Sequence, residues 1–205
     1  MATVQHRIGP ADQGRKMTLQ EFWDAEEEPG YLYELARGVL EVSEVPGDLH
    51  WQVIHNLHEL FSLHGRRYPL LIHRIGHGSE VRYIIPEFET DRHPDLAILF
   101  RGESRHDVKG RVVSVLGVEV VSPGKRSRDR DYIDKRIDYL AFGLLEYWIV
   151  DPDLRQVTVL VRREVDGIPA WEERIFSGED LILSNLLAGF AGSVNELWTD
   201  LDSEG

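Results

Sequence analysis

The chain has 205 residues, of which 42% are hydrophobic, and a formal net charge of −13 at pH 7. This length suits one α/β domain with a sizeable core, and the acidic charge argues against nucleic-acid binding by the whole surface, because duplex affinity comes largely from neutralising phosphates. No apolar run is long enough to span a membrane, and the absence of cysteine excludes disulfides and thiolate metal sites. We therefore expect a cytoplasmic protein with no membrane partner.

The first third of the chain predicts short elements. Residues 1–16 have no hydrophobic periodicity, and we expect a flexible leader there. Thr18 to Glu21 form a capping box that predicts a short helix. Residues 31–43 predict a hairpin with Gly38 in its turn. Glu34 lies near the end of the first arm, and from this segment alone we interpret it as an exposed strand residue.

A second helix is predicted from Asp48, a candidate N-cap, to about His64. Four histidines lie in it. His50, near the start of the helix, could face a site, and otherwise these histidines are surface or half-buried helix residues. Residues 68–74 and 80–85 predict strands around a turn at 76–78, and residues 86–92 predict a polar loop.

Two apolar strands follow, and each carries a carboxylate. Residues 93–100 predict a strand with Asp95 at its mouth, where an aspartate could also serve as a turn or capping residue. Residues 112–121 predict a strand buried on both faces, with Glu119 among valines. Burying an unpaired carboxylate costs roughly several kcal/mol, so Glu119 indicates a bound cation or a catalytic duty. Gly117 shares its face and is expected to leave room beside the carboxylate.

A helix is predicted from about residue 128 to 142. Ile133 and Ile137 are expected on a buried face, and Asp134 and Asp138 on the solvent side. Lys135 borders an aromatic stripe, so its ammonium could extend to water or toward a site over the sheet.

The last third predicts a buried strand at 146–150, an antiparallel hairpin from 156–162 and 170–176, and a short helix near 193–198. No repeat or linker interrupts the chain. We expect a single mixed-sheet α/β domain over residues 17–199 and a C-terminal tail at 200–205.

Taken together, these positions suggest metal chemistry. Asp95 and Glu119 lie on neighbouring predicted strands, Lys135 follows on the next helix, and Glu34 lies upstream. Hard oxygen ligands suit Mg²⁺ or Mn²⁺ better than zinc. Such an ion can polarise a phosphoryl oxygen, and a nearby lysine can stabilise developing charge. This set predicts metal-assisted phosphodiester hydrolysis.

The chain resembles the Uma-type restriction endonuclease family of the PD-(D/E)XK nuclease superfamily. Four segments carry the resemblance, which covers roughly residues 18–198: YELARG (33–38), HPDLAIL (93–99), VEVVSP (118–123) and GLLEYWIVDP (143–152). It implies an α/β restriction-endonuclease-like core, a mixed central β-sheet flanked by helices.

The resemblance also implies roles for individual residues. It identifies Asp95, Glu119 and Glu34 as catalytic residues and ligands of Mg²⁺ or Mn²⁺, with DNA as substrate. The superfamily lysine would stand two residues after Glu119, where this chain has Val121. In Uma-like sequences the lysine lies on the following helix, which implies Lys135 as the fourth catalytic residue.

Residues around this set could support it. Tyr139 lies one helical turn after Lys135, and His50 is a further candidate. Arg126 and Arg128 follow the Glu119 strand and could contact phosphate, or they could belong to a solvated loop neutralised by nearby aspartates. No base-reading motif is visible.

The leading hypothesis is a Mg²⁺-dependent DNA endonuclease. The alternatives are a catalytically silent member of the fold that binds nucleic acid or protein, and a metal-dependent hydrolase of another phosphoester. Cleavage of both strands of a duplex is commonly done by two-fold pairs of subunits, so we expect a homodimer.

Overall fold

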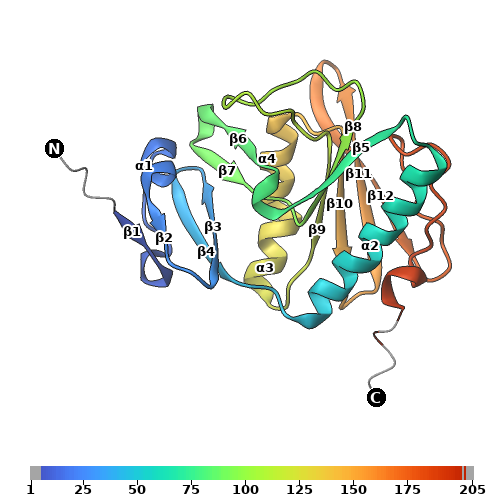
Figure 1. The fold of residues 1–205 in the computed structure, drawn as a ribbon, viewed down its shortest axis with the longest axis horizontal. Helices are drawn as coiled ribbons and strands as arrows, with labels where there is room; N and C mark the ends of the chain where they lie inside the picture. The colour runs from blue at the N-terminus through green and yellow to red at the C-terminus, as the bar shows by residue number, and fades with distance from the viewer. Residues whose placement is uncertain (1–5, 200, 202–205) are drawn as a thin grey trace.

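A six-stranded mixed sheet forms the centre of the protein (Figure 1). The computed structural model describes residues 6–199 and 201. The strands lie in the order β12-β11-β10-β9-β8-β5. Only the β9–β10 pair is parallel, and the other neighbours are antiparallel. Their bounds are β5 (Ile72–His77), β8 (Leu96–Phe100), β9 (Leu116–Val120), β10 (Glu146–Asp151), β11 (Gln156–Val165) and β12 (Ile168–Ser177).

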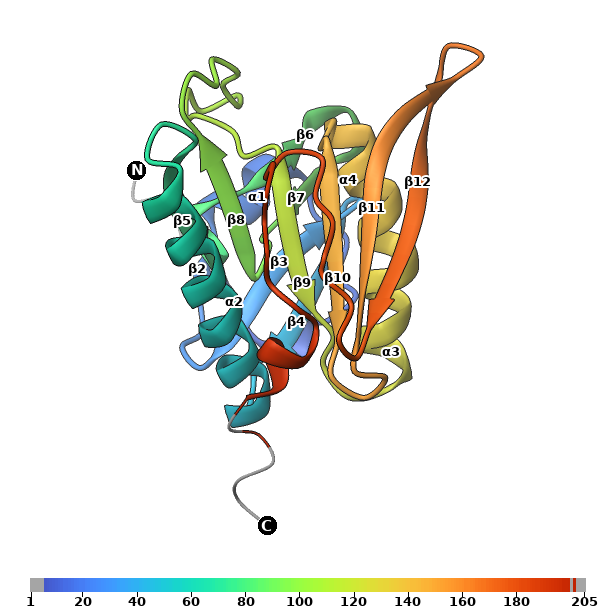
Figure 2. The ribbon, with the colours of Figure 1, turned by 90° about the vertical axis from the view of Figure 1, so that its right-hand side faces the viewer.

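Helices cover both faces of this sheet (Figure 2). One face packs on α2 (Asp48–Arg67) and the 3₁₀ turn η5 (Asn195–Trp198). The other packs on a continuous helical segment made of α3 (Lys125–Asp129), the π-helical turn η4 (Arg130–Asp134) and α4 (Lys135–Phe142). In β9, Val118 faces α2 whereas Val121, just beyond the strand, faces α4. A strand buried on both faces needs such a continuous apolar run, and the predicted fold class is confirmed.

A smaller sheet lies beside the central one, on the N-terminal side (Figure 1). Its strand order is β4-β3-β7-β6. A two-stranded sheet, a helix and three 3₁₀ turns complete the fold. The bounds are β1 (Arg7–Ile8), η1 (Pro10–Asp12), α1 (Leu19–Asp24), β2 (Glu26–Glu27), β3 (Tyr31–Ala36), β4 (Val39–Glu44), η2 (Gly78–Glu80), β6 (Tyr83–Ile85), η3 (Pro86–Phe88) and β7 (Thr90–Arg92).

Several local predictions agree with the structure. The capping box joins Thr18 and Glu21 at the start of α1. The β3–β4 hairpin turns through Arg37 and Gly38, which both have positive φ values, of 51° and 74°. Two consecutive positive values match the twist of a tight hairpin, and glycine adopts them without strain. The N-cap of α2, however, is Gly47 and not Asp48.

Two stretches differ from the predicted strands and loops. β5 begins at residue 72 and extends into the predicted turn at 76–78, because its pairing with β8 continues as far as His77. The predicted polar loop at 86–92 contains β7, whose three residues are all buried. Two of those three residues are charged, so no hydrophobic alternation marks β7 in the sequence.

The two ends of the chain can be compared with the predicted leader and the predicted tail. The expected flexible leader contains β1, which pairs in parallel with β2, and Ile8 is fully buried. Residues 6–16 are therefore part of the folded structure, while residues 1–5 lie outside the described residues. Of the expected tail at 200–205, only residue 201 is described. The single-domain interpretation of residues 17–199 stays a prediction.

The helical segment after β9 is rotated relative to the expected orientation. Ile133 and Ile137, predicted to be buried, are 53% and 51% exposed. Asp138, predicted to face solvent, is 1% exposed because it forms ion pairs with Arg37 in the β3–β4 turn and Arg92 in β7. Charge pairing with these two arginines thus sets the orientation of α4. Within the described residues, no helix is long and apolar enough to cross a membrane.

Candidate active site

Asp95 immediately precedes β8 and Glu119 lies near the end of β9, so both lie at the same end of this antiparallel pair. Leu96 pairs with Val118 in the antiparallel register, so the next pair outward sets Asp95 opposite Glu119. The backbone N–H of Val120 donates to Asp95 Oδ2 at 2.7 Å, which fixes the aspartate beside β9. Directly opposite side chains in such a pair have Cβ atoms about 5 Å apart, and two like charges there repel. The pair therefore needs a positive charge nearby.

Lys135, the first residue of α4, provides that charge. Its Nζ lies 2.9 Å from Glu119 Oε2 and 3.3 Å from Glu34 Oε1, and it donates to the backbone oxygen of His93 at 3.3 Å. Burial opposes the charged form, but the charges of Glu119 and Glu34 outweigh it and raise the pKa of Lys135 above its usual value. Lys135 is thus an ammonium ion at neutral pH.

Glu119 is almost completely buried, with 2% of its surface exposed. One carboxylate oxygen accepts the lysine contact, and the other accepts a hydrogen bond from Tyr139 Oη. Burial raises the pKa of Glu119 well above its usual value despite the opposing charge of Lys135, and the negative charge of Asp95 raises it further. A bound cation would favour the ionised form of this residue.

Glu34 approaches the same lysine from β3. Its Oε1 accepts from the backbone N–H of His93 at 2.7 Å, and its Oε2 lies 3.4 Å from Arg92 Nη1. Burial raises the pKa of Glu34, but the charges of Lys135 and Arg92 outweigh it and hold that pKa well below its usual value. The structure thus brings Glu34 to Lys135 while engaging both of its oxygens.

Of the three expected metal ligands, Asp95 and Glu119 therefore form a pair, and Glu34 is not grouped with them. Among residues 6–199 and 201, no three His, Cys, Asp or Glu side chains are grouped so that they could hold a metal ion. Asp95 and Glu119 nevertheless fit a hard cation as a pair, because Mg²⁺ is commonly bound by one or two carboxylates with water and substrate phosphate as its remaining ligands. Asp95 has a 20% exposed side chain and lines an open cleft, which admits such ligands.

This cleft has a volume of about 740 Å³ and lies between the two sheets and the start of α2. Glu34, Asp95, Glu119 and Lys135 all line it. The four predicted catalytic residues, which come from four separate segments of the chain, therefore meet at one cavity. Burial with a few convergent polar groups is typical of a ligand site.

The predicted supporting residues have different positions. His50 Nε2 lies 3.3 Å from Asp95 Oδ2, and its Nδ1 lies 3.3 Å from Ser122 Oγ. Burial raises the pKa of Asp95, but the hydrogen bond and charge of His50 outweigh it and lower that pKa. Tyr139 contacts Glu119 directly, as described above. His50 and Tyr139 thus each hold one of the two facing carboxylates.

The two candidate phosphate contacts differ from each other. Arg126 is exposed and lines the cleft. Arg128 instead contacts Asp151 and Asp153 and lies over the ring of Tyr132. These contacts engage Arg128 outside the cleft lining. Of the two residues, only Arg126 lies where a substrate phosphate could reach it.

The sequence did not reveal Arg92, which is central to the site. This residue of β7 is 1% exposed, and its guanidinium contacts Glu34, Glu41 at 2.6 Å and Asp138 at 3.1 Å. Buried arginine is stable only when it is paired in this way. No sequence signal could have identified it, because its partners lie up to 58 residues away along the chain.

The expected space beside Gly117 is filled. A Cβ atom at this position would lie 2.7 Å from Tyr83 Oη and 3.2 Å from Leu144 Cδ1. Gly117 therefore admits the ring of Tyr83, which packs edge-on against Tyr139. The absent side chain supports the tyrosine layer behind Glu119 and leaves no room for a ligand there.

Comparisons with known proteins agree with this architecture. The mixed central sheet flanked by helices is a nuclease-like fold, and residues 19–195 match the model of the Uma2 family, described as "Putative restriction endonuclease". The chain belongs to the Uma2 family. No curated protein matches it.

A solved structure shares the fold. It is the crystal structure of a protein from Anabaena variabilis, described as "a putative nuclease belonging to DUF820". The TM-score is 0.68 at 17% sequence identity, and the match covers 89% of this chain and 97% of that one. At this identity the likeness establishes the fold, and the chemistry must be argued from the residues of this chain.

Proposed function

We propose that this protein is a metal-dependent endonuclease that hydrolyses phosphodiester bonds of DNA. The observation that carries the proposal is the buried ammonium of Lys135, 2.9 Å from Glu119, at a cleft that Asp95 also lines. Membership of the Uma2 family supports nuclease chemistry in general. The metal and the DNA substrate are the further steps of this proposal.

The facing carboxylates of Asp95 and Glu119 would hold Mg²⁺ or Mn²⁺. When bound, the ion would polarise a phosphoryl oxygen and lower the pKa of a water molecule. His50 and the N–H of Val120 orient Asp95, while Tyr139 orients Glu119. These contacts fix both ligands before the substrate arrives, which is the role that surrounding hydrogen bonds have in metal sites.

Lys135 would act on the substrate by its charge. During hydrolysis the oxygen of water loses a proton to solvent and forms a bond to phosphorus, while the bond from phosphorus to one sugar oxygen breaks and that oxygen takes up a proton. Negative charge grows on the phosphoryl oxygens in this step, and a fixed ammonium in a water-poor site stabilises it. Because its pKa is raised, Lys135 keeps its proton and does not serve as the base. Glu34, held by Arg92 and His93, positions this lysine.

Nicking of supercoiled plasmid with Mg²⁺ or Mn²⁺ tests this proposal. Asp95→Asn and Glu119→Gln remove a ligand charge with little change in shape, and Glu164→Gln at an exposed position of β11 is the matched control. The native protein and the control should nick DNA, and the two site variants should not. Equal nicking by all four proteins would contradict the proposal.

Calorimetry with Mn²⁺ separates the metal site from the reaction. The native protein should bind Mn²⁺, and Asp95→Asn and Glu119→Gln should each weaken that binding at least tenfold. Metal binding by the native protein without nicking of any DNA would indicate a binding module or another phosphoester substrate.

Assembly and location complete the proposal. We expect a homodimer, because two single-site subunits related by two-fold symmetry can cut both strands of a duplex. A monomer mass in solution at micromolar concentration would contradict this. A cytoplasmic location is consistent with the absence of cysteine.

A further inference from the structure

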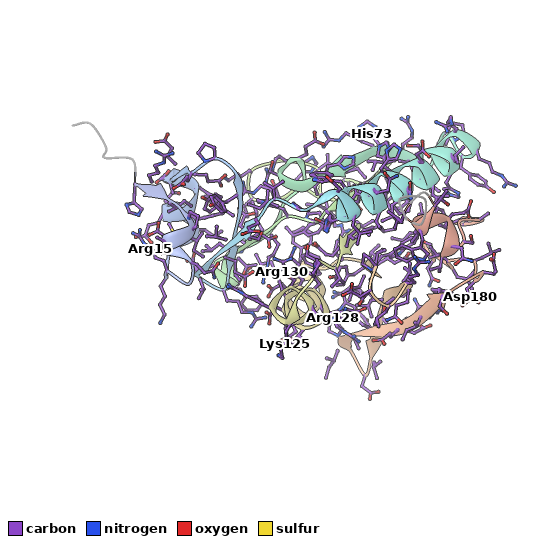
Figure 3. The ribbon with its side chains drawn as sticks, turned by 90° about the horizontal axis from the view of Figure 1, so that it is seen from below. Arg15, His73, Lys125, Arg128, Arg130 and Asp180 are labelled. Carbon is purple, nitrogen blue, oxygen red and sulfur yellow. The ribbon has the colours of Figure 1, made fainter. Side chains whose placement is uncertain are left out.

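The basic segment after β9 carries four cationic side chains with different surroundings: Lys125, Arg126, Arg128 and Arg130. Lys125 is 88% exposed and pairs with Asp129. Arg128 is engaged by Asp151 and Asp153. Figure 3 shows that the labelled side chains of Lys125, Arg128 and Arg130 leave this helical segment in different directions. Arg130, with a 19% exposed side chain, lines the cleft.

Asp131 holds Arg130 from the interior. Its side chain is 1% exposed, and its Oδ1 accepts from Arg130 Nε at 3.1 Å. Tyr147 Oη donates to the backbone oxygen of Asp131 at 2.9 Å and fixes the main chain there. Arg130 and Asp131 both lie in the π-helical turn η4. Such a turn inserts a residue into the helical repeat and commonly marks a functional site.

This contact engages only one edge of the guanidinium. Among the described residues, Nε has the ion-pair partner Asp131, and no hydrogen bond or ion pair joins Nη1 or Nη2 to another side chain. The two Nη groups present the paired N–H donors that bind carboxylate or phosphate in a bidentate manner. Within the described part of the chain, Asp131 Oδ2 is also buried and has no hydrogen-bond partner, so only the other oxygen of this carboxylate is satisfied, by Arg130.

The charge of the cleft adds a second argument. The basic residues that line it are Arg126, Arg130 and Lys135, and they lie among many carboxylates. Lys135 is engaged by Glu119 and Glu34, and Arg126 has an exposed side chain. Arg130 is thus the lining cation that is both fixed in direction and still has donors to offer. An anionic substrate is attracted into an acidic cleft where such a positive charge meets it.

We propose that Arg130 binds a phosphate of the substrate in this cleft and that Asp131 is the positioning residue that directs its guanidinium. This inference rests on the proposed nuclease function. The competing explanation is that Arg130 only neutralises the buried carboxylate of Asp131. The two explanations differ in what happens to binding when Arg130 is changed in a protein that stays folded.

The test compares Arg130→Gln and Arg130→Lys with Arg163→Gln. Arg163 is a matched control, because its Nε also contacts a carboxylate, that of Glu172 at 2.8 Å, but on the exposed β11–β12 hairpin. The readouts are the affinity for a fluorescent DNA duplex in EDTA at several salt concentrations, and kcat and KM for nicking. Thermal unfolding shows which variants are folded.

Arg130→Gln should weaken duplex binding about tenfold or more, because a charge-assisted phosphate contact is lost. The slope of log affinity against log salt should fall by about one, as expected for one phosphate contact. Arg130→Lys should keep the salt slope and recover part of the affinity, since it retains the charge without the bidentate geometry. Arg163→Gln should change neither quantity.

The positioning role of Asp131 is tested by whether its effect depends on Arg130. Asp131→Ala should raise KM more than it lowers kcat, and Asp131→Asn, which keeps an oxygen for Arg130 Nε, should restore most of the loss. In the Arg130→Gln background, Asp131→Ala should add no further change in KM, because a positioning residue acts only through its partner.

A folded Arg130→Gln protein with native duplex affinity and salt slope would overturn the proposal and leave neutralisation of Asp131 as its role. If the native protein binds duplex but nicks no DNA, the proposed hydrolysis is wrong, and the binding comparison still decides the role of Arg130. If the native protein binds no duplex at all, the phosphate-binding assignment is also overturned.

Discussion

Lys135 Nζ lies 2.9 Å from Glu119 Oε2, and both side chains are almost completely buried. The lysine begins α4 and the glutamate lies within β9, so the contact joins a helix to the sheet that it covers. A buried pair of this kind is weak evidence for stability, because desolvation of both charges offsets their attraction. Its position at a cleft instead favours a role in catalysis, and it can be tested directly.

Lys135→Arg keeps the positive charge and moves it. Because Glu119 and Glu34 retain a cationic partner, we expect the protein to stay folded, while nicking falls by about a hundredfold through misplaced charge. Arg136→Gln, the adjacent position at the exposed side of α4, is the control. Nicking rates and thermal unfolding of both variants check the prediction. Native nicking by a folded Lys135→Arg protein would count against a precise role for the ammonium.

Tyr139→Phe removes the hydroxyl that donates to buried Glu119. Leaving a buried acceptor without its partner should lower the free energy of unfolding by about 1–3 kcal/mol. Urea denaturation of Tyr139→Phe, Glu119→Gln and the double variant measures the interaction between the two residues. The double variant should be less destabilised than the sum of the single changes. Strict additivity would show that the hydroxyl contributes nothing through Glu119.

Arg92→Leu should destabilise the protein by about 3–5 kcal/mol, because it removes one partner from a buried ion-pair network. Arg92 contacts three carboxylates, of Glu34, Glu41 and Asp138, and is 1% exposed. Arg37→Gln is the matched control, since Arg37 also pairs with Asp138 but has a 53% exposed side chain. Exposed pairs contribute about 0–1 kcal/mol. Urea denaturation distinguishes the two, and similar losses for both variants would contradict this account.

Glu146 predicts a dependence of stability on pH. It is fully buried in β10, and burial raises its pKa even though Trp148 Nε1 and the N–H of Asn185 donate to its oxygens at 2.6 and 2.9 Å. The folded protein then holds the Glu146 proton more tightly than the unfolded chain does. This residue's contribution to stability is therefore largest at low pH and declines as the pH rises from about 4.3 toward the raised pKa.

Glu146→Gln removes this titration. The stability of the variant relative to the native protein should accordingly increase with pH between about 4.5 and 7. Urea denaturation at intervals across that range measures the difference. Parallel stability curves for the two proteins would show that the folded protein does not retain a proton on Glu146.

The central sheet and the unusual position of Glu119 could be predicted from the sequence, because both depend on local patterns. A valine-rich run indicates a strand buried on both faces. Folding alone does not explain why Glu119 lies within such a run. The glycine at 38 and the capping box at residues 18–21 likewise act over a few residues. Asp95, Glu34 and Lys135 became candidates only when the four positions were considered together, and the ordered family motifs then implied their roles.

Only the tertiary structure decided how these residues meet. Glu34 and Lys135 are about a hundred residues apart in sequence, and the pairing of β3 with β7 brings the glutamate to the lysine. β7 itself was missed because its charged residues are buried by partners from other elements. The orientation of α4 was mistaken for the same reason, since Asp138 points to Arg37 and Arg92 and leaves Ile133 exposed. Hydrophobic patterning specifies which strands and helices form, whereas buried charges are satisfied by distant partners that no local pattern encodes.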